Sequence, residues 1–95
     1  MHYVIYCRDN PSTPTRRDEH YDEHRTYLKS TAIKIVLAGP WLDEKGKVKI
    51  GSMLVVDTES IEEAKAFQRN DPFARHAVWS EAFVNPYVIN IDNRS

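Results

Sequence analysis

The chain has 95 residues, of which 41% are hydrophobic and 28% charged, with 13 Lys and Arg against 14 Asp and Glu. This length and this balance predict a single folded domain over residues 1–95. The net charge of −1 argues against a nucleic-acid partner, and no apolar run approaches the ~20 residues that cross a membrane, so we expect no membrane partner. There is no basic segment typical of a secretory signal, and the only cysteine, Cys7, cannot form an internal disulfide. We therefore expect a cytoplasmic protein.

The first part of the chain predicts a strand followed by a helix. Residues 2–7 are β-branched or aromatic, which is typical of a strand, and turn-forming residues follow them. Thr13 followed by Pro14 is typical of a helix start, and the charged segment after it predicts a helix to about Ser30. One face of this helix is unusually polar for a core face. It contains Arg17, His20, Tyr21, His24, Tyr27 and Leu28.

Two strands are predicted next. Residues 33–38 form a short apolar run, and we expect this strand to end at Gly39 and Pro40, because proline cannot continue a hydrogen-bond ladder. A charged turn that contains Gly46 follows. Residues 48–56 then predict the third strand.

The last part of the chain predicts a second helical region and a final strand. Ser60 and Glu63 form a capping box, in which each residue can satisfy a free backbone N–H of the other, so a helix begins here. Asp71 followed by Pro72 is typical of the start of another short helical turn. Residues 79–91 alternate in character and predict a long last strand.

The resulting order β-α-β-β-α-β predicts a ferredoxin-like α+β sandwich with a four-stranded antiparallel sheet. Its helices can cover only one face of that sheet. The third strand nevertheless has Leu54 and Val56 on one face and Met53 and Val55 on the other. A second apolar face needs a cover, and a second copy of the same sheet in a two-fold homodimer is the simplest one. The alternative is a monomer whose second face is a ligand groove.

A pair of histidines could in principle bind a metal ion. His20 and His24 lie four residues apart on one helical face, which lets two imidazoles reach one ion. A third ligand is not evident, because Tyr21 occupies the position where metalloproteases carry their general-base Glu. We therefore expect neither a metal nor another cofactor, and metal binding is the weaker alternative.

His24 has a second possible role. Tyr21 and Leu28 flank it on the buried side, and a buried imidazole needs a hydrogen-bond partner for each ring nitrogen. Asp71 is the best candidate partner. Because Pro72 follows it, Asp71 is also a typical helix N-cap. The two roles are compatible, since one carboxylate oxygen can cap the helix while the other faces His24.

Seven short segments form a series along almost the whole chain. They are Tyr3-Val4-Ile5-Tyr6, His24-Arg25-Thr26-Tyr27-Leu28, Ala38-Gly39-Pro40, Gly51-Ser52-Met53-Leu54, Ser60-Ile61-Glu62-Glu63-Ala64, Asp71-Pro72-Phe73 and Asn85-Pro86-Tyr87. In this order and near this spacing, the chain resembles the YciI-like (YCII-related) family of the dimeric α/β-barrel superfamily. It differs from the family in a slightly shorter segment between His24 and Gly39, and in His20, which has no clear counterpart.

The resemblance implies a ferredoxin-like protomer in a sheet-to-sheet dimer, with a pocket in which a His and an Asp are proposed as a catalytic dyad. The matching residues here are His24 and Asp71, and Gly51 and Ser52 match a Gly-Ser pair on the strand that lines the family's pocket. The candidate substrate-binding residues are Arg17, His20, Gly51 and Ser52.

One characterised relative in the family is a dehydrochlorinase that acts on a chlorinated hydroxyquinol. The resemblance therefore implies a cofactor-free, lyase-like enzyme that uses the His-Asp dyad for general acid-base chemistry on a small acidic or phenolic molecule. The alternative is a non-catalytic small-molecule-binding or accessory dimeric module in which the same pair is structural. An open cavity at His24 favours the enzyme. The expected partners are a second copy of the chain, or a higher assembly, and a small-molecule ligand.

Overall fold

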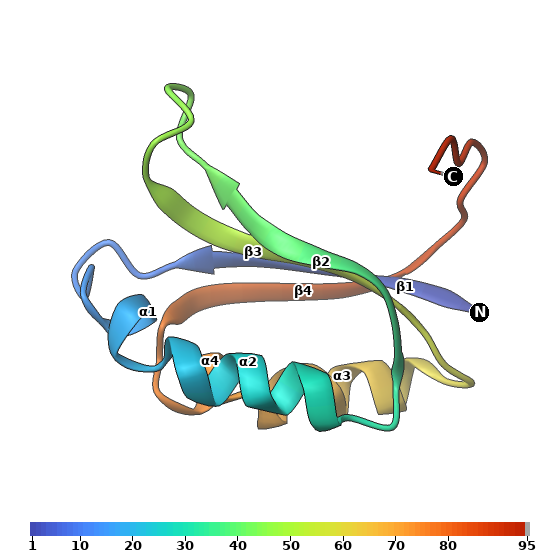
Figure 1. Cartoon of the computed structure of the whole chain (residues 1–95). Helices are drawn as coiled ribbons and strands as arrows, with labels where there is room; N and C mark the ends of the chain where they lie inside the picture. Colours follow the sequence, from blue (N-terminus) through green and yellow to red (C-terminus); the bar gives the residue numbers. More distant parts are fainter. Residues whose placement is uncertain (95) are drawn as a thin grey trace.

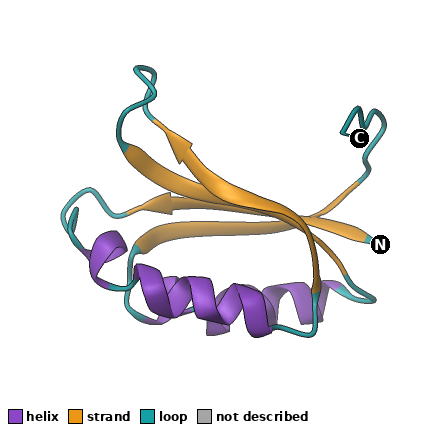
Figure 2. Ribbon diagram, in the orientation of Figure 1, coloured by secondary structure: helices purple, strands orange, loops and turns teal. Residues whose placement is uncertain are grey.

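The computed structural model describes residues 1–94 and has two layers, with the helices on one side of a four-stranded sheet (Figure 1). Figure 2 shows the same arrangement by element type, with the helical layer beneath the strands. Two helices make up each helical connection of the β-α-β-β-α-β order. The elements are β1 (His2–Asp9), α1 (Arg16–Glu19), α2 (Tyr21–Ser30), β2 (Lys34–Leu42), β3 (Lys49–Asp57), α3 (Ile61–Asn70), α4 (Pro72–Arg75) and β4 (Trp79–Tyr87).

The sheet has the strand order β2-β3-β1-β4, and each neighbouring pair is antiparallel. β1 therefore lies inside the sheet, where it pairs with β3 from His2 opposite Asp57 to Arg8 opposite Gly51. β4 pairs with the other side of β1 and forms one edge, and β2 forms the other edge. The predicted ferredoxin-like α+β fold is confirmed.

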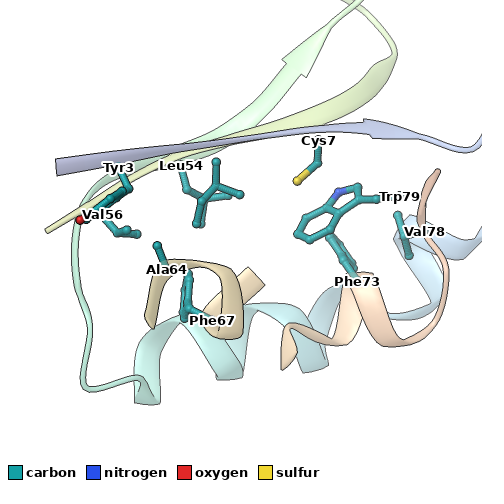
Figure 3. Packing of buried hydrophobic residues seen from close by; sticks show 10 residues of the cluster. Tyr3, Cys7, Leu54, Val56, Ala64, Phe67, Phe73, Val78 and Trp79 are labelled. Atoms are coloured by element: carbon teal, nitrogen blue, oxygen red, sulfur yellow. The ribbon is translucent and has the colours of Figure 1, made fainter. Parts of the chain in front are cut away.

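The core lies between the helices and the sheet face that they cover, as Figure 3 shows. Side chains alternate along β1, so that Tyr3, Ile5 and Cys7 point toward the helices while Tyr6 stays partly exposed. Phe73 of α4 is fully buried at the end of the core where β4 begins. Burial of these apolar side chains is the main force that holds the two layers together. The buried cluster also contains Leu54, Val56, Ala64, Phe67, Val78 and Trp79.

The first helical region is not the single helix that the sequence predicts over residues 14–30. It consists of α1 and α2, which are separated at His20, where φ is −111° and ψ is 12°, outside the helical range. The residue before α1 is Thr15 and not Thr13, whose hydroxyl donates to the Asn10 carbonyl at 3.4 Å. None of the helices in residues 1–94 is long and apolar enough to cross a membrane.

The prediction that the second strand ends at Gly39 and Pro40 is wrong. β2 continues through both residues to Leu42. Because β2 is an edge strand and pairs only with β3, Pro40 can lie opposite Ser52 without interrupting a second ladder. An edge position thus tolerates a proline that would disrupt an inner strand.

The last strand is shorter than the predicted segment 79–91, since β4 ends at Tyr87. Residues 88–94 leave the sheet and lie on the side opposite the helices (Figure 1). There the Arg94 Nη1 donates to the Val36 carbonyl of β2 at 3.2 Å. This tail covers part of the second sheet face.

The rest of the second face exposes aromatic side chains, among them Phe83, which is 55% exposed. Trp41 lies parallel to Tyr6, with ring centroids 5.2 Å apart, and its indole N–H donates to the Cys7 carbonyl at 3.0 Å. Gly51 makes room for this indole, because a Cβ there would lie 2.1 Å from Trp41 Cε2 and 2.4 Å from the Cys7 carbonyl oxygen. The second apolar face predicted from the sequence is therefore present and only partly covered within one chain.

Candidate functional site

His24 and Asp71 lie in direct contact although 47 positions separate them in the chain. His24 comes from α2, and Asp71 lies between α3 and α4. The distance from His24 Nδ1 to Asp71 Oδ1 is 2.7 Å. The same oxygen accepts the backbone N–H of Phe73 at 2.9 Å and so caps α4. The capping and the imidazole contact are both expected from the sequence, but Oδ1 makes both of them, whereas one oxygen was expected for each.

The His24 ring is held by its neighbours in one orientation. It lies parallel to the Phe73 ring, with centroids 3.9 Å apart, and meets the edge of Trp79 at 6.2 Å. Because a carboxylate oxygen accepts, Nδ1 carries the proton that points to Asp71, and Nε2 remains for another partner. His24 is 9% exposed, so its contact with solvent is limited to the side that lines a cavity.

That cavity has a volume of about 180 Å³ and lies between the first helical region and the sheet. His24 and Ser52 line it, and so do three cationic side chains, Arg17, Arg25 and Lys49. No acidic side chain of residues 1–94 lines it. The site therefore suits a small ligand with negative charge. The complete lining consists of Arg17, Tyr21, His24, Arg25, Leu28, Ala38, Gly39, Pro40, Lys49, Ser52 and Leu54.

A buried polar network lies beside the cavity. The Arg17 guanidinium binds Asp9 with two hydrogen bonds of 2.7 Å, from Nε and from Nη2. Nη2 also donates to Ser52 Oγ at 2.8 Å, and the Trp79 indole N–H donates to the same oxygen at 3.3 Å. Arg17 and Ser52 are 7% and 4% exposed, so these contacts are shielded from water.

Four of the six candidate residues come together at this site, and two do not. Arg17, His24 and Ser52 line the cavity, and Asp71 lies behind His24. Gly51 is not part of the lining, because the position that a Cβ would take there points toward Trp41 on the other side of the sheet. His20 is also outside the lining.

His20 belongs to a separate cluster with Glu23 and His76. Its Nδ1 lies 3.1 Å from Glu23 Oε1, and His76 Nε2 lies 3.3 Å from Glu23 Oε2. The hydrogen bond with His20 holds the pKa of the Glu23 carboxyl below its usual value. Within residues 1–94 these three side chains, and not His20 with His24, form the group whose metal-ligating atoms lie within 4.8 Å of one another.

Sequence reasoning did not identify Asp9, Trp79 or His76 as neighbours of candidate residues. Asp9 reaches Arg17 only because the loop after β1 turns back to α1, and no residue spacing reveals that turn. The sequence singles out Phe73 only as part of the segment Asp71-Pro72-Phe73, which resembles the family. Its position two residues after Asp71, at the start of a short helix, is the one signal that connects it to the site.

Cys7 is near this network but does not provide a reactive thiolate. It is completely buried on β1. Burial raises the pKa of its thiol to about 12, and the negative charge of Asp71 adds to the effect. The thiol therefore stays protonated at neutral pH.

Comparison with known proteins identifies the family. The profile of the YCII-related domain matches residues 1–87. The chain belongs to the YCII-related family. This YCII-related protein is also 27% identical over 94 residues to an uncharacterized protein of Haemophilus influenzae, and the match covers 92% of this chain and 96% of that protein.

Solved structures have the same fold. The 5-chloro-2-hydroxyhydroquinone dehydrochlorinase of Burkholderia phenoliruptrix, in complex with 2,5-dihydroxybenzoquinone, has a TM-score of 0.82 and 30% identity, and the match covers 93% of this chain and 94% of that one. A second structure, of a putative antibiotic biosynthesis monooxygenase of Chloroflexus aurantiacus, has a TM-score of 0.53 and 19% identity, and the match covers 97% and 98%. Because the identity is only 19%, this second similarity supports the fold of the YCII-related protein and not its function.

Proposed function

We propose that this YCII-related protein is a cofactor-free, lyase-like enzyme that acts on a small acidic or phenolic molecule. The observation that carries the proposal is the 2.7 Å contact between His24 Nδ1 and Asp71 Oδ1, made by a ring that also lines the cavity. The cationic lining supports an acidic ligand. The dehydrochlorinase, which is 30% identical over 93% of this chain, supports a lyase-like reaction.

In the proposed reaction, His24 transfers a proton and Asp71 orients the imidazole. With its Nδ1 proton donated to Asp71, neutral His24 accepts a proton from the ligand at Nε2, and the carboxylate stabilises the imidazolium that forms. In a chlorinated hydroxyquinol, this proton is delivered to the chlorine-bearing carbon as the ring takes its keto form. Loss of a second hydroxyl proton then forms a second C=O bond, the ring double bond shifts, and chloride leaves with the electrons of the C–Cl bond. The ligand loses HCl in total, and no oxidant or reductant is consumed.

A non-catalytic small-molecule-binding or accessory module is the second candidate. Asp71 Oδ1 also caps α4 through the Phe73 N–H, and the His24 ring packs on the Phe73 ring. Both contacts would also be present if His24 and Asp71 only stabilised the fold and took no part in catalysis. In this alternative, the ligand binds in the cavity without turnover.

We also propose that two chains form a homodimer through the second sheet face. Phe83 and Tyr87 are 55% and 43% exposed on this face, and Tyr6 of the central strand is 40% exposed. Aromatic side chains grouped on one sheet face are typical of an interface. A second copy of the same face would bury them with two-fold symmetry.

Chloride release from 5-chloro-2-hydroxyhydroquinone and related chlorinated phenols distinguishes the two candidate functions. The enzyme proposal expects turnover by the wild type and a loss of about 10²-fold or more in His24→Asn, the usual size of a general acid-base contribution. His2→Asn, a matched change outside the cavity lining, should keep full activity. Ligand binding without chloride release, unchanged in His24→Asn, would support the binding module instead.

A further inference from the structure

The hydroxyl of Ser52 is held so that it can only donate to a ligand. A serine oxygen has two lone pairs and one proton. Arg17 Nη2 and Trp79 Nε1 both donate to Ser52 Oγ, at 2.8 and 3.3 Å, and neither nitrogen can accept a hydrogen bond. Both lone pairs are therefore occupied, and the proton needs an acceptor. No residue in the range 1–94 accepts a hydrogen bond from it, and Ser52 lines the cavity.

Neither donor can easily turn away. Arg17 is fixed by its two hydrogen bonds to Asp9, and its guanidinium carbon lies 4.9 Å from the centre of the Phe73 ring. The Trp79 ring meets Phe73 edge to face, at 5.7 Å between centroids. Because the Arg17 guanidinium is bound to Asp9 and Ser52, its role is to position the Ser52 hydroxyl, and it need not bind the ligand itself.

The charges around the cavity act in the same direction. Arg25 and Lys49 line it, both are exposed, and neither has an ion-pair partner within the part of the chain that the structure describes. A ligand oxygen beside Ser52 thus meets a hydroxyl that must donate, in a cavity that two available cations also line. A deprotonated oxygen satisfies both conditions, and hydrogen bonds to charged groups are stronger than those to neutral groups.

We infer that Ser52 Oγ–H selects ligands that place an anionic oxygen, a phenolate or an enolate, at this point of the cavity, and that Arg17 and Trp79 are the positioning residues that fix the direction of its proton. The inference rests on the proposed function only in taking this cavity as the ligand site. It concerns binding and does not require catalysis by His24.

The test uses 2,5-dihydroxybenzoquinone, whose acidic hydroxyl groups make it an anion at neutral pH, and compares it with its neutral dimethyl ether. Affinities are measured by isothermal titration. We expect the wild type to prefer the anion by about tenfold or more, and Ser52→Ala to lose that factor while its affinity for the ether changes less than about twofold. Ser30→Ala, a matched change at an exposed serine, should keep the preference.

Two further variants separate selection from a merely structural role. Ser52→Thr keeps the hydroxyl and should retain the preference for the anion. Trp79→Phe frees one lone pair of Ser52, so the hydroxyl is no longer restricted to donating and the preference should fall even where the fold is intact by circular dichroism. If Ser52→Ala does not fold, the Trp79→Phe result decides.

Three results would overturn the inference: no binding of the dihydroxyquinone by the wild type at millimolar concentration, equal losses for both ligands in Ser52→Ala, or an unchanged preference in Trp79→Phe. Failure of the proposed enzyme activity is a different outcome. It would appear as absent chloride release with the preference for the anion still present in the wild type and in His24→Asn.

Discussion

The imidazole of His24 lies parallel to the ring of Phe73, with centroids 3.9 Å and planes 4° apart. Phe73 is also the residue whose N–H is capped by Asp71. Three consecutive residues, 71–73, therefore supply the carboxylate that orients the imidazole, the proline that begins α4 and the ring on which the imidazole rests. A helix of four residues is enough for this purpose, because its N-cap and its first buried side chain both face α2.

Loss of the charge at Asp71 should weaken the hydrogen bond that holds the His24 imidazole. In Asp71→Asn, an amide oxygen can still cap α4, but the negative charge 2.7 Å from Nδ1 is gone. Because charge-assisted hydrogen bonds are shorter and stronger than neutral ones, we expect the NMR signal of the His24 Nδ1 proton to lie far downfield in the wild type and to move upfield in the variant. Asp22→Asn, on the exposed surface of α2, is the matched control and should leave this signal unchanged. An identical Nδ1 proton signal in Asp71→Asn and in the wild type would contradict a charge-assisted hydrogen bond between the two residues.

The Cys7 thiol should resist alkylation in the folded protein. Its pKa is raised to about 12 by burial, so the reactive thiolate is almost absent at pH 8. We expect labelling to be slow in the native protein and fast after denaturation in urea. Because the folded state disfavours the thiolate, ionisation of Cys7 favours unfolding. The free energy of unfolding should therefore be constant below the ordinary pKa of 9.0 and should decline as the pH rises from there toward 12. The decline should be smaller in Cys7→Ala, and native labelling as fast as in urea would contradict the burial.

The sequence predicted those parts of the fold that depend on local chemistry. The cap at Ser60 is an example: Ser60 Oγ accepts the Glu63 N–H at 3.2 Å, and α3 begins at Ile61 as expected. Only this half of the predicted capping box forms, because the Glu63 carboxylate accepts from the hydroxyls of Thr58 and Ser60 and not from the Ser60 N–H. The predicted ends of elements were wrong where they depend on contacts with residues that are distant in the sequence. β2 continues through Pro40 because it lies at an edge, and strand order cannot be read from that segment alone.

The same distinction applies to the site. His24 and Asp71 could be paired from the sequence because a buried imidazole needs a partner and because the family resemblance marked both residues. The hydrogen-bond network around Ser52 could not be predicted from the sequence, because it joins residues of four separate elements: the end of β1, α1, β3 and β4. Gly51 illustrates the limit: it is adjacent to Ser52 in sequence, but strand alternation turns it to the opposite face, toward Trp41.

The homodimer should be detectable in solution. We expect light scattering at micromolar concentration to give the mass of two chains, because the second face exposes Phe83 and its aromatic neighbours. Phe83→Glu would place a charge in that interface and should shift the protein to monomers. Lys65→Glu, on the exposed surface of α3, should not. A wild type that is monomeric under these conditions would contradict the proposal.

Protein isolated without added metal should carry no stoichiometric zinc. His20 and His24 are engaged by different carboxylates, Glu23 and Asp71, so the two imidazoles do not share a site. The rings of His20 and His76 lie parallel at 3.8 Å, so their in-plane nitrogens point side by side and do not converge at the ~2.0–2.1 Å that zinc requires. Elemental analysis is the measurement. One zinc per chain would contradict the expectation, and its loss in His24→Ala or His76→Ala would locate it.

Replacement of Gly51 by alanine should destabilise the fold far more than the same change at Gly39. A Cβ on Gly51 would lie 2.1 Å from Trp41 Cε2 and 2.4 Å from the Cys7 carbonyl oxygen, and the backbone atom cannot move without disturbing the pairing of β1 with β3. Trp41 would have to leave its position on Tyr6 and give up its hydrogen bond to Cys7.

Such overpacking costs about 1–3 kcal/mol of unfolding free energy, and the lost indole hydrogen bond adds to it. Gly39→Ala is the matched control, because no atom lies within 4 Å of the place that its new methyl group would occupy, and a change within about 0.5 kcal/mol is expected. Urea unfolding of both variants, followed by circular dichroism, measures the difference. Equal midpoints for the two variants would show that Trp41 is not held against Gly51 in solution.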